Sequence, residues 1–148
     1  MKKGITPIIA IIILLLITIG LAATAWTYLS GFLGTYTKSL TLVDSYCIAG
    51  INSTVIMRNS GTEAISVGTC GASSSFSGNT AQTCGALTIT RTDGNAFSNA
   101  YLSTTGTLGT QQMVTFTDGC TTSGSPRVCT YRFSTGVTGA TVVTVTCG

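Results

Sequence analysis

Hydrophobic and polar positions divide this chain into two regions with different periods. The first, from Gly4 to Thr37, contains no charged residue and opens with a nearly continuous aliphatic run. This run exceeds the roughly 20 apolar residues that a membrane-spanning helix needs. Further along, the apolar residues thin to a stripe with steps of three and four, the spacing of one helical face: Trp26, Leu29, Phe32, Leu33, Tyr36, Leu40 and Val43. The pattern predicts one continuous helix over residues 5–45, amphipathic in its second half.

The second region, from Ile48 onward, alternates with period two. In residues 51–58, Ile51, Val55 and Met57 share one face. Inward pairs recur further along at Leu87 with Ile89 and at Val114 with Phe116. The same alternation continues in two later segments, where the sets Cys129, Tyr131, Phe133 and Val143, Val145, Cys147 alternate with their neighbours. Clusters of Gly, Ser, Asn and Asp separate these segments, as is typical of half-buried antiparallel strands. The expected fold is α+β: a long N-terminal hydrophobic helix followed by a small disulfide-bonded antiparallel β-sandwich or barrel-like domain over residues 46–148.

Three tracts rich in Ser and Thr interrupt the strand pattern, at residues 73–80, 104–110 and 121–125. We interpret them as loops, because hydrophobic strands end each tract before it becomes long. A mucin-like stalk is the alternative interpretation. Isolated threonines could carry O-linked sugar in either case.

The distribution of charge predicts how the chain lies across a membrane. Lys2 and Lys3 precede the apolar run and Lys38 follows it, so the positive-inside rule leaves the N-terminus in the cytoplasm and the remainder outside. Charged residues are only 7% of the chain, and the formal net charge of +3 includes Lys2 and Lys3. The exported part therefore has no basic field that would recruit nucleic acid.

Six cysteines support an oxidising location, since disulfides are rare in the cytosol. Six cysteines allow fifteen pairings, of which we favour Cys47 with Cys147, Cys70 with Cys84, and Cys120 with Cys129. The first pair would join the end of the helix to the last strand, the second would close a Ser-rich loop, and the third would cross the neck of a hairpin. In the chain-entropy model, loops of about 15 and 100 residues correspond to about 3 and 4.7 kcal/mol.

Asn52, Ser53 and Thr54 form an N-glycosylation acceptor triplet. Such a triplet is useful only on an exported surface, which agrees with the predicted orientation. It also occurs often by chance, so Asn52 is a candidate glycosylation site and the chain a candidate glycoprotein.

The sequence contains few of the residues on which enzyme active sites usually depend. It contains no histidine, the residue used most often for general acid and base catalysis, and no pair of cysteines with the spacing of a zinc site. The carboxylates Asp44, Glu63, Asp93 and Asp118 are widely separated, and Asp93-Gly94 and Asp118-Gly119 are typical of turns. We predict no catalytic residue, no metal site and no cofactor.

The N-terminus resembles the class III signal peptide and first helix of archaeal type IV pilins. The resemblance rests on the basic leader ending at Gly4, the Ile5-Thr6-Pro7 start and the aliphatic run that follows. It implies that residues 1–4 are a signal removed by a prepilin peptidase between Gly4 and Ile5. Bacterial type IV pilins usually have an acidic residue where this chain has Ile9, which favours the archaeal branch.

The resemblance implies a structural pilin that polymerises through its helix into an extracellular cell-surface filament, with surface adhesion as its role. The implied partners are copies of the same chain, the prepilin peptidase, an assembly ATPase, a membrane platform protein, and the membrane itself before assembly. The candidate core residues are Pro7, Ile8, Ile11, Leu14, Leu15, Ile19, Leu21 and Trp26. The alternatives are a membrane-anchored exported binding module, for example for sugars, and an archaellin-type subunit of a motility filament.

Overall fold

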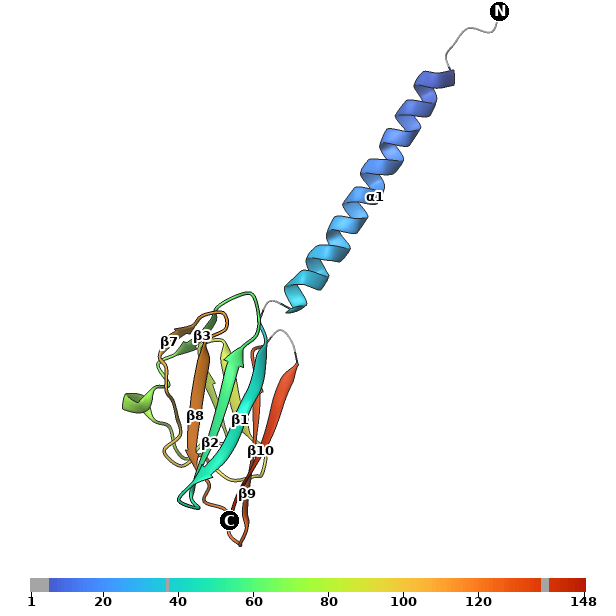
Figure 1. Ribbon diagram of the computed structural model, residues 1–148. Helices are drawn as coiled ribbons and strands as arrows, with labels where there is room; N and C mark the ends of the chain where they lie inside the picture. Colours follow the sequence, from blue (N-terminus) through green and yellow to red (C-terminus); the bar gives the residue numbers. More distant parts are fainter. Residues whose placement is uncertain (1–5, 37, 137–138) are drawn as a thin grey trace, which may run out of the picture. The chain divides into compact units, whose positions relative to one another are not determined.

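The computed structural model describes residues 6–36, 38–136 and 139–148. The chain forms two compact units, Met1–Thr35 and Tyr36–Gly148. The described part of the first unit is helix α1, which runs from Thr6 to Tyr36 and so ends at the first residue of the second unit (Figure 1). Pro7 lies in its first turn, where the missing N–H has no intrahelical acceptor and costs nothing.

The helix is shorter than the sequence pattern predicts, because residues 40–45 belong to a strand. Strand β1 extends from Leu40 to Ile48 and pairs antiparallel with β2, Asn52–Asn59. A register shift between Leu42 and Asp44 inserts one extra residue into β1. Such a bulge changes the period of two locally, so the step of three from Leu40 to Val43 has the spacing of a helical face although both residues are extended.

The second unit is built from two four-stranded antiparallel sheets and a two-stranded one, among the described residues. The first sheet has the order β1-β2-β8-β6, with β8 at Met113–Gly119 and β6 at Tyr101–Leu102. The second has the order β10-β9-β5-β4, with β10 at Ala140–Cys147, β9 at Arg127–Ser134, β5 at Leu87–Arg91 and β4 at Ala81–Cys84. Strands β3, Ile65–Gly68, and β7, Gly106–Leu108, pair with each other, and a short 3-10 helix, η1, covers Ala72–Ser74. The predicted α+β class with a disulfide-bonded strand domain is confirmed.

The core lies between the two larger sheets, and its residues are mostly those that the alternation predicted. The inward pairs expected on β5 and β8 are buried, and so are Val55 and Met57 on β2. On β9 and β10, one of the two alternating faces is buried. Phe116 packs edge-on against Tyr131 and Phe133, with ring centroids 5.2 and 5.4 Å apart. Ile51 is the exception, since it lies in the turn before β2 and its side chain is 48% exposed.

The Ser- and Thr-rich tracts are only partly loops. Residues 121–125 contain no strand, as predicted. The tract at 104–110, however, contains β7, and the tract at 73–80 contains the end of η1 and a bridge from Phe76 to Ala100. Leu108 and Phe76 explain the difference, because each is a buried apolar residue that anchors its tract to the core.

Candidate functional sites: the apolar helix and a buried polar cluster

Helix α1 is apolar on every side. The segment Pro7–Gly31 is long and apolar enough to cross a membrane, and none of its most apolar stretch is buried. Pro7 is exposed, and the other predicted core residues are between 54% and 75% exposed: Ile8, Ile11, Leu14, Leu15, Ile19, Leu21 and Trp26. A helix with hydrophobic side chains all round is stable only in lipid or among other apolar helices.

Four hydroxyl groups of α1, those of Thr18, Thr24, Thr27 and Ser30, donate to carbonyl oxygens of the same helix. Thr18 donates to the Leu15 carbonyl oxygen at 2.9 Å, and Thr24 donates to the Leu21 carbonyl oxygen at the same distance. Thr27 donates to the Thr24 carbonyl oxygen in the same way. Because these bonds point back along the helix, the hydroxyls cost little in a medium that contains no water.

The candidate cleavage site between Gly4 and Ile5 lies outside the described residues. The helix begins one residue later, at Thr6. The short leader and its processing therefore remain predictions from the sequence.

The structure contains the three disulfides that the sequence analysis favoured. Cys47 bonds Cys147, Cys70 bonds Cys84, and Cys120 bonds Cys129. Cys47 lies near the end of β1 instead of at the end of the helix, so the first bond joins one sheet of the strand domain to the other. Three disulfides in a domain of this size are characteristic of proteins outside the cytoplasm.

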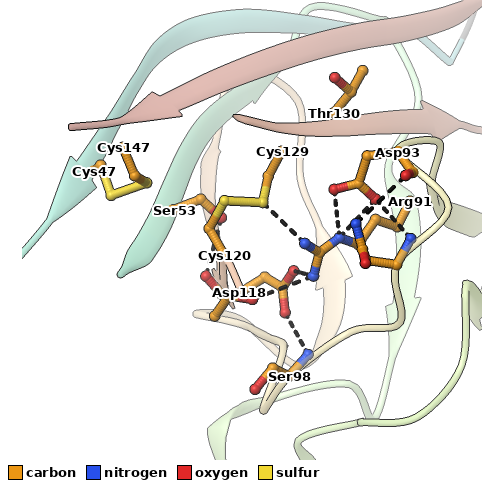
Figure 2. The surroundings of a disulfide bond; sticks show 12 residues. Cys47, Ser53, Arg91, Asp93, Ser98, Asp118, Cys120, Cys129, Thr130 and Cys147 are labelled. Carbon is orange, nitrogen blue, oxygen red and sulfur yellow. Dashed lines mark hydrogen bonds and ion pairs between the residues drawn. A yellow bond between two sulfur atoms is a disulfide. The ribbon is translucent and has the colours of Figure 1, made fainter. Parts of the chain in front are cut away.

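A cluster of buried polar side chains lies beside the Cys120–Cys129 disulfide (Figure 2). Arg91, the last residue of β5, pairs with Asp118 on β8 at 3.1 Å, and both side chains are completely buried. Its Nε donates to both carboxylate oxygens of Asp93, at 2.9 and 3.0 Å. Its Nη2 donates to the Cys129 sulfur at 3.0 Å. The guanidinium therefore uses all three nitrogens within the protein.

Tyr131 and Ser53 complete the cluster. The Tyr131 hydroxyl donates to Oδ2 of Asp118 at 2.9 Å and also contacts the Ser53 hydroxyl, while Ser53 donates to the Asp118 carbonyl oxygen at 3.0 Å. Burial raises the pKa of Asp118 above its ordinary value, although the Ser98 amide, Tyr131 and Arg91 act in the opposite direction. Burial, together with the neighbouring Asp118 carboxylate, raises the pKa of Tyr131.

The predicted turn at Asp118-Gly119 is wrong. Asp118 lies inside β8 and is completely buried. The alternation of β5 could have predicted the burial of Arg91, since Arg91 shares the face of Leu87 and Ile89. A buried arginine requires a buried acid, and Asp118 is that acid.

This cluster has the chemistry of a structural support. The acids Asp93 and Asp118 are held by Arg91 and backbone N–H groups. Asp44 and Glu63 are exposed, and the Glu63 carboxylate lies 3.9 Å from the ammonium group of the half-buried Lys38. Across residues 6–36, 38–136 and 139–148, no three His, Cys, Asp or Glu side chains come together in a way that could hold a metal ion.

Asn52, the candidate glycosylation residue, is exposed at the start of β2. Ser53 and Thr54, the other members of its triplet, are buried. Asn52 lines a hollow of about 380 Å³ at this end of the strand domain. The side chain is therefore accessible in the folded protein.

Comparison with family models, with characterised proteins and with solved structures found no match to this chain.

Proposed function

We propose that this chain is the structural subunit of a type IV pilus-like extracellular filament that serves surface attachment. The observation that carries the proposal is the Pro7–Gly31 segment of α1, whose side chains are all exposed and mostly apolar. Such a helix suits two environments in succession, the membrane before assembly and a bundle of identical helices after it.

Small residues on α1 support close packing of neighbouring helices. Gly20 is followed within five residues by Ala22, Ala23 and Ala25, and the space beside Gly20 is open. Helices that leave lipid gain little from the hydrophobic effect, because lipid is as apolar as a neighbouring helix. Their association depends on packing, which small residues improve. Extraction from the membrane therefore requires work, and an assembly ATPase with a membrane platform protein is the proposed source.

The strand domain also carries exposed apolar side chains, in support of contacts between subunits. They gather on β1, the edge strand of its sheet, where four side chains are 43–50% exposed: Leu42, Val43, Tyr46 and Ile48. Contiguous exposed apolar surface marks an interaction site or an aggregation hazard, and an edge strand adds unpaired backbone groups. Neighbouring subunits would cover this strand in a filament.

A charge placed in α1 tests the proposal. In cells competent for assembly, the wild-type chain should form filaments with α1 at their core, whereas Leu15→Asp should form none. An unpaired carboxylate would have to be desolvated in every packed subunit, at a cost of several kcal/mol. Leu15→Ile preserves the apolar surface and Thr146→Asp places the same charge on an exposed strand position, so both should still assemble.

Negative-stain and cryo-electron microscopy provide the measurement, and membrane fractionation checks that Leu15→Asp is inserted. Wild-type protein that stays monomeric in the membrane of competent cells would contradict the proposal. So would filaments in which the strand domains make every subunit contact. Either result would favour the anchored binding module instead.

A further inference from the structure

The end of the strand domain where β1 finishes and β2 begins contains a hollow of about 380 Å³. Its volume is within the range of about 300–1,000 Å³ typical of small-molecule sites. Six polar residues line it, and none of them is charged: Asn52, Ser98, Asn99, Tyr101, Thr117 and Thr121. They come from β2, β6, β8 and the segments before β6 and after β8.

The hollow lies at the far end of the domain from the place where the chain enters it. β1 starts at Leu40, where the Thr141 hydroxyl donates to the Leu40 carbonyl oxygen at 3.0 Å. β1 then runs the length of the sheet to Ile48, and Asn52 begins the return strand (Figure 1). The hollow is therefore separated from the Leu40 end by the whole length of β1.

The polar groups of the hollow are available to a ligand. Four side chains of the hollow have no side-chain hydrogen bond to any described residue. They are the side-chain amide of Asn52 and the hydroxyls of Tyr101, Thr117 and Thr121. The side-chain amide of Asn99 uses only its oxygen, which accepts from the Ser77 hydroxyl at 3.3 Å. Asn52, Asn99 and Thr121 are exposed, and Tyr101 is half-buried.

The buried polar cluster holds one wall of the hollow in place. Oδ1 of Asp118 accepts from the backbone N–H of Ser98 at 2.8 Å (Figure 2). Nη1 of Arg91 donates to the Ala96 carbonyl oxygen at 2.8 Å. The Gly119 amide donates to the Ser98 carbonyl oxygen at 2.9 Å. A Cβ at Gly119 would lie 3.0 Å from Ser98 atoms, so the two segments are in close contact.

Asn99 adds a second sign that this wall is preorganised. Its φ of 53° lies in the left-handed region, which is uncommon for residues other than glycine. The backbone N–H of Asn99 donates to the Ser77 hydroxyl at 2.8 Å, and this bond stabilises the conformation. Backbone in such a region persists where the surroundings impose it, and it occurs often at binding sites. A buried ion pair adds little net stability, because both charges must be desolvated. Its hydrogen bonds can, however, hold the residues that line a binding site in position.

From this chemistry we propose that the hollow binds a neutral saccharide. Hydroxyl groups both donate and accept hydrogen bonds, and amide side chains present a donor and an acceptor side by side. These are the partners that a polyhydroxyl ligand needs. The Tyr101 ring supplies an apolar surface for the C–H groups of a sugar. A carboxylate, phosphate or sulfate would require a cationic partner, and no cationic side chain lines the hollow. The inference depends on the strand domain alone and stands whether or not the chain assembles into filaments.

The saccharide has two possible sources. It can belong to another molecule or surface, or it can be a glycan attached to Asn52, which both belongs to the acceptor triplet and lines the hollow. In the second case the attached glycan fills the site of its own subunit. The two sources predict different behaviour of the native protein.

The test uses the full chain in lipid nanodiscs, produced in a host without N-glycosylation. The probes are immobilised neutral hexose and N-acetylhexosamine oligosaccharides, with sialylated and sulfated oligosaccharides for comparison. We expect binding to a subset of the neutral probes and none to the acidic ones. Asn99→Gly, which tolerates the positive φ, and Thr121→Val should each weaken binding, and Tyr101→Ala should weaken it by at least about tenfold.

Thr146→Val is the matched control, because it removes a hydroxyl from an exposed strand position outside the hollow and should leave binding unchanged. Three intact disulfides and an unchanged melting temperature exclude misfolding of a variant. The inference is overturned if no neutral probe binds, if acidic probes bind equally well, or if the Asn99 and Tyr101 variants bind as well as the wild type.

The native protein then identifies the source. If peptide mass mapping finds a glycan on Asn52, the native chain should not bind the neutral probes, and enzymatic removal of the glycan should restore binding. If Asn52 is unmodified, native and unglycosylated chains should bind equally. Microscopy of the same variants separates this result from filament assembly, since saccharide binding can be lost while filaments persist.

Discussion

Cys47 and Cys147 connect the edge strands of the two sheets, with their Cα atoms 5.3 Å apart. β1 and β10 belong to different sheets, so no backbone ladder joins them. The disulfide spans a sequence separation of 100 residues and includes most of the strand domain in its loop. It therefore links the two sheets covalently at their β1 and β10 edges.

The double variant Cys47→Ala/Cys147→Ala should lose more stability than Cys70→Ala/Cys84→Ala. The chain-entropy model assigns about 4.7 kcal/mol to a loop of 100 residues and about 3 kcal/mol to one of 15, and the second disulfide spans 14. Chemical denaturation of the two variants under identical conditions measures the difference. An equal loss, or a greater one in the Cys70–Cys84 variant, would show that loop length does not govern these bonds.

Replacing Arg91 by Met should destabilise the strand domain by about 3–5 kcal/mol, because two carboxylates would lose their buried partner. Adding Asp118→Asn to Arg91→Met should recover part of the loss, since one uncompensated charge is removed. Arg132→Met, which removes an exposed arginine from the adjacent strand β9, should change stability little. Denaturation midpoints at neutral pH provide the comparison, and additive effects of the Arg91 and Asp118 changes would contradict direct coupling.

Tyr131 should make the protein sensitive to alkali. In the unfolded chain its phenol ionises near the ordinary pKa of 10.0, but in the folded protein the raised pKa keeps it neutral. The unfolded state therefore loses its proton first, and stability decreases as pH rises above about 10. The Tyr131→Phe variant should show a smaller decrease in stability above pH 10. At neutral pH the variant should be less stable than the wild type, because Asp118 loses a hydrogen bond. Denaturation midpoints from pH 8 to 11, with Tyr101→Phe as the control, test the prediction.

Processing between Gly4 and Ile5 predicts that the exported protein begins at Ile5. Intact mass spectrometry or N-terminal sequencing of that protein measures the start directly. Replacing Gly4 with a bulky residue should leave unprocessed precursor in the membrane, because the peptidase in the resembled family cuts directly after a glycine. An exported chain that retains Met1 would contradict the class III interpretation.

Much of the fold could be predicted because it depends on local patterns. The aliphatic run of α1 permits only an apolar environment, and period-two alternation placed pairs such as Val114 and Phe116 in the core correctly. The pairing of Cys120 with Cys129 followed from the same strands, since the two cysteines flank one connection between β8 and β9. These features need only the neighbouring residues in the chain to define them.

Tertiary structure alone decided the features that depend on residues far apart in the sequence. The bulge between Leu42 and Asp44 and the pairing of β1 with β2 overrode the helical spacing that extends to Val43, because cross-strand pairs stabilise an extended segment that has no helical partner. In the sequence, Asp118 has the pattern of a turn residue. Only the packing of the two sheets brings it into contact with Arg91, 27 residues away. The hollow likewise combines Asn52 with Asn99 and Thr121, which approach one another because β2 and β6 both pair with β8. The sequence determined which segments are apolar, extended or cross-linked, whereas the packing of the sheets determined which polar groups meet.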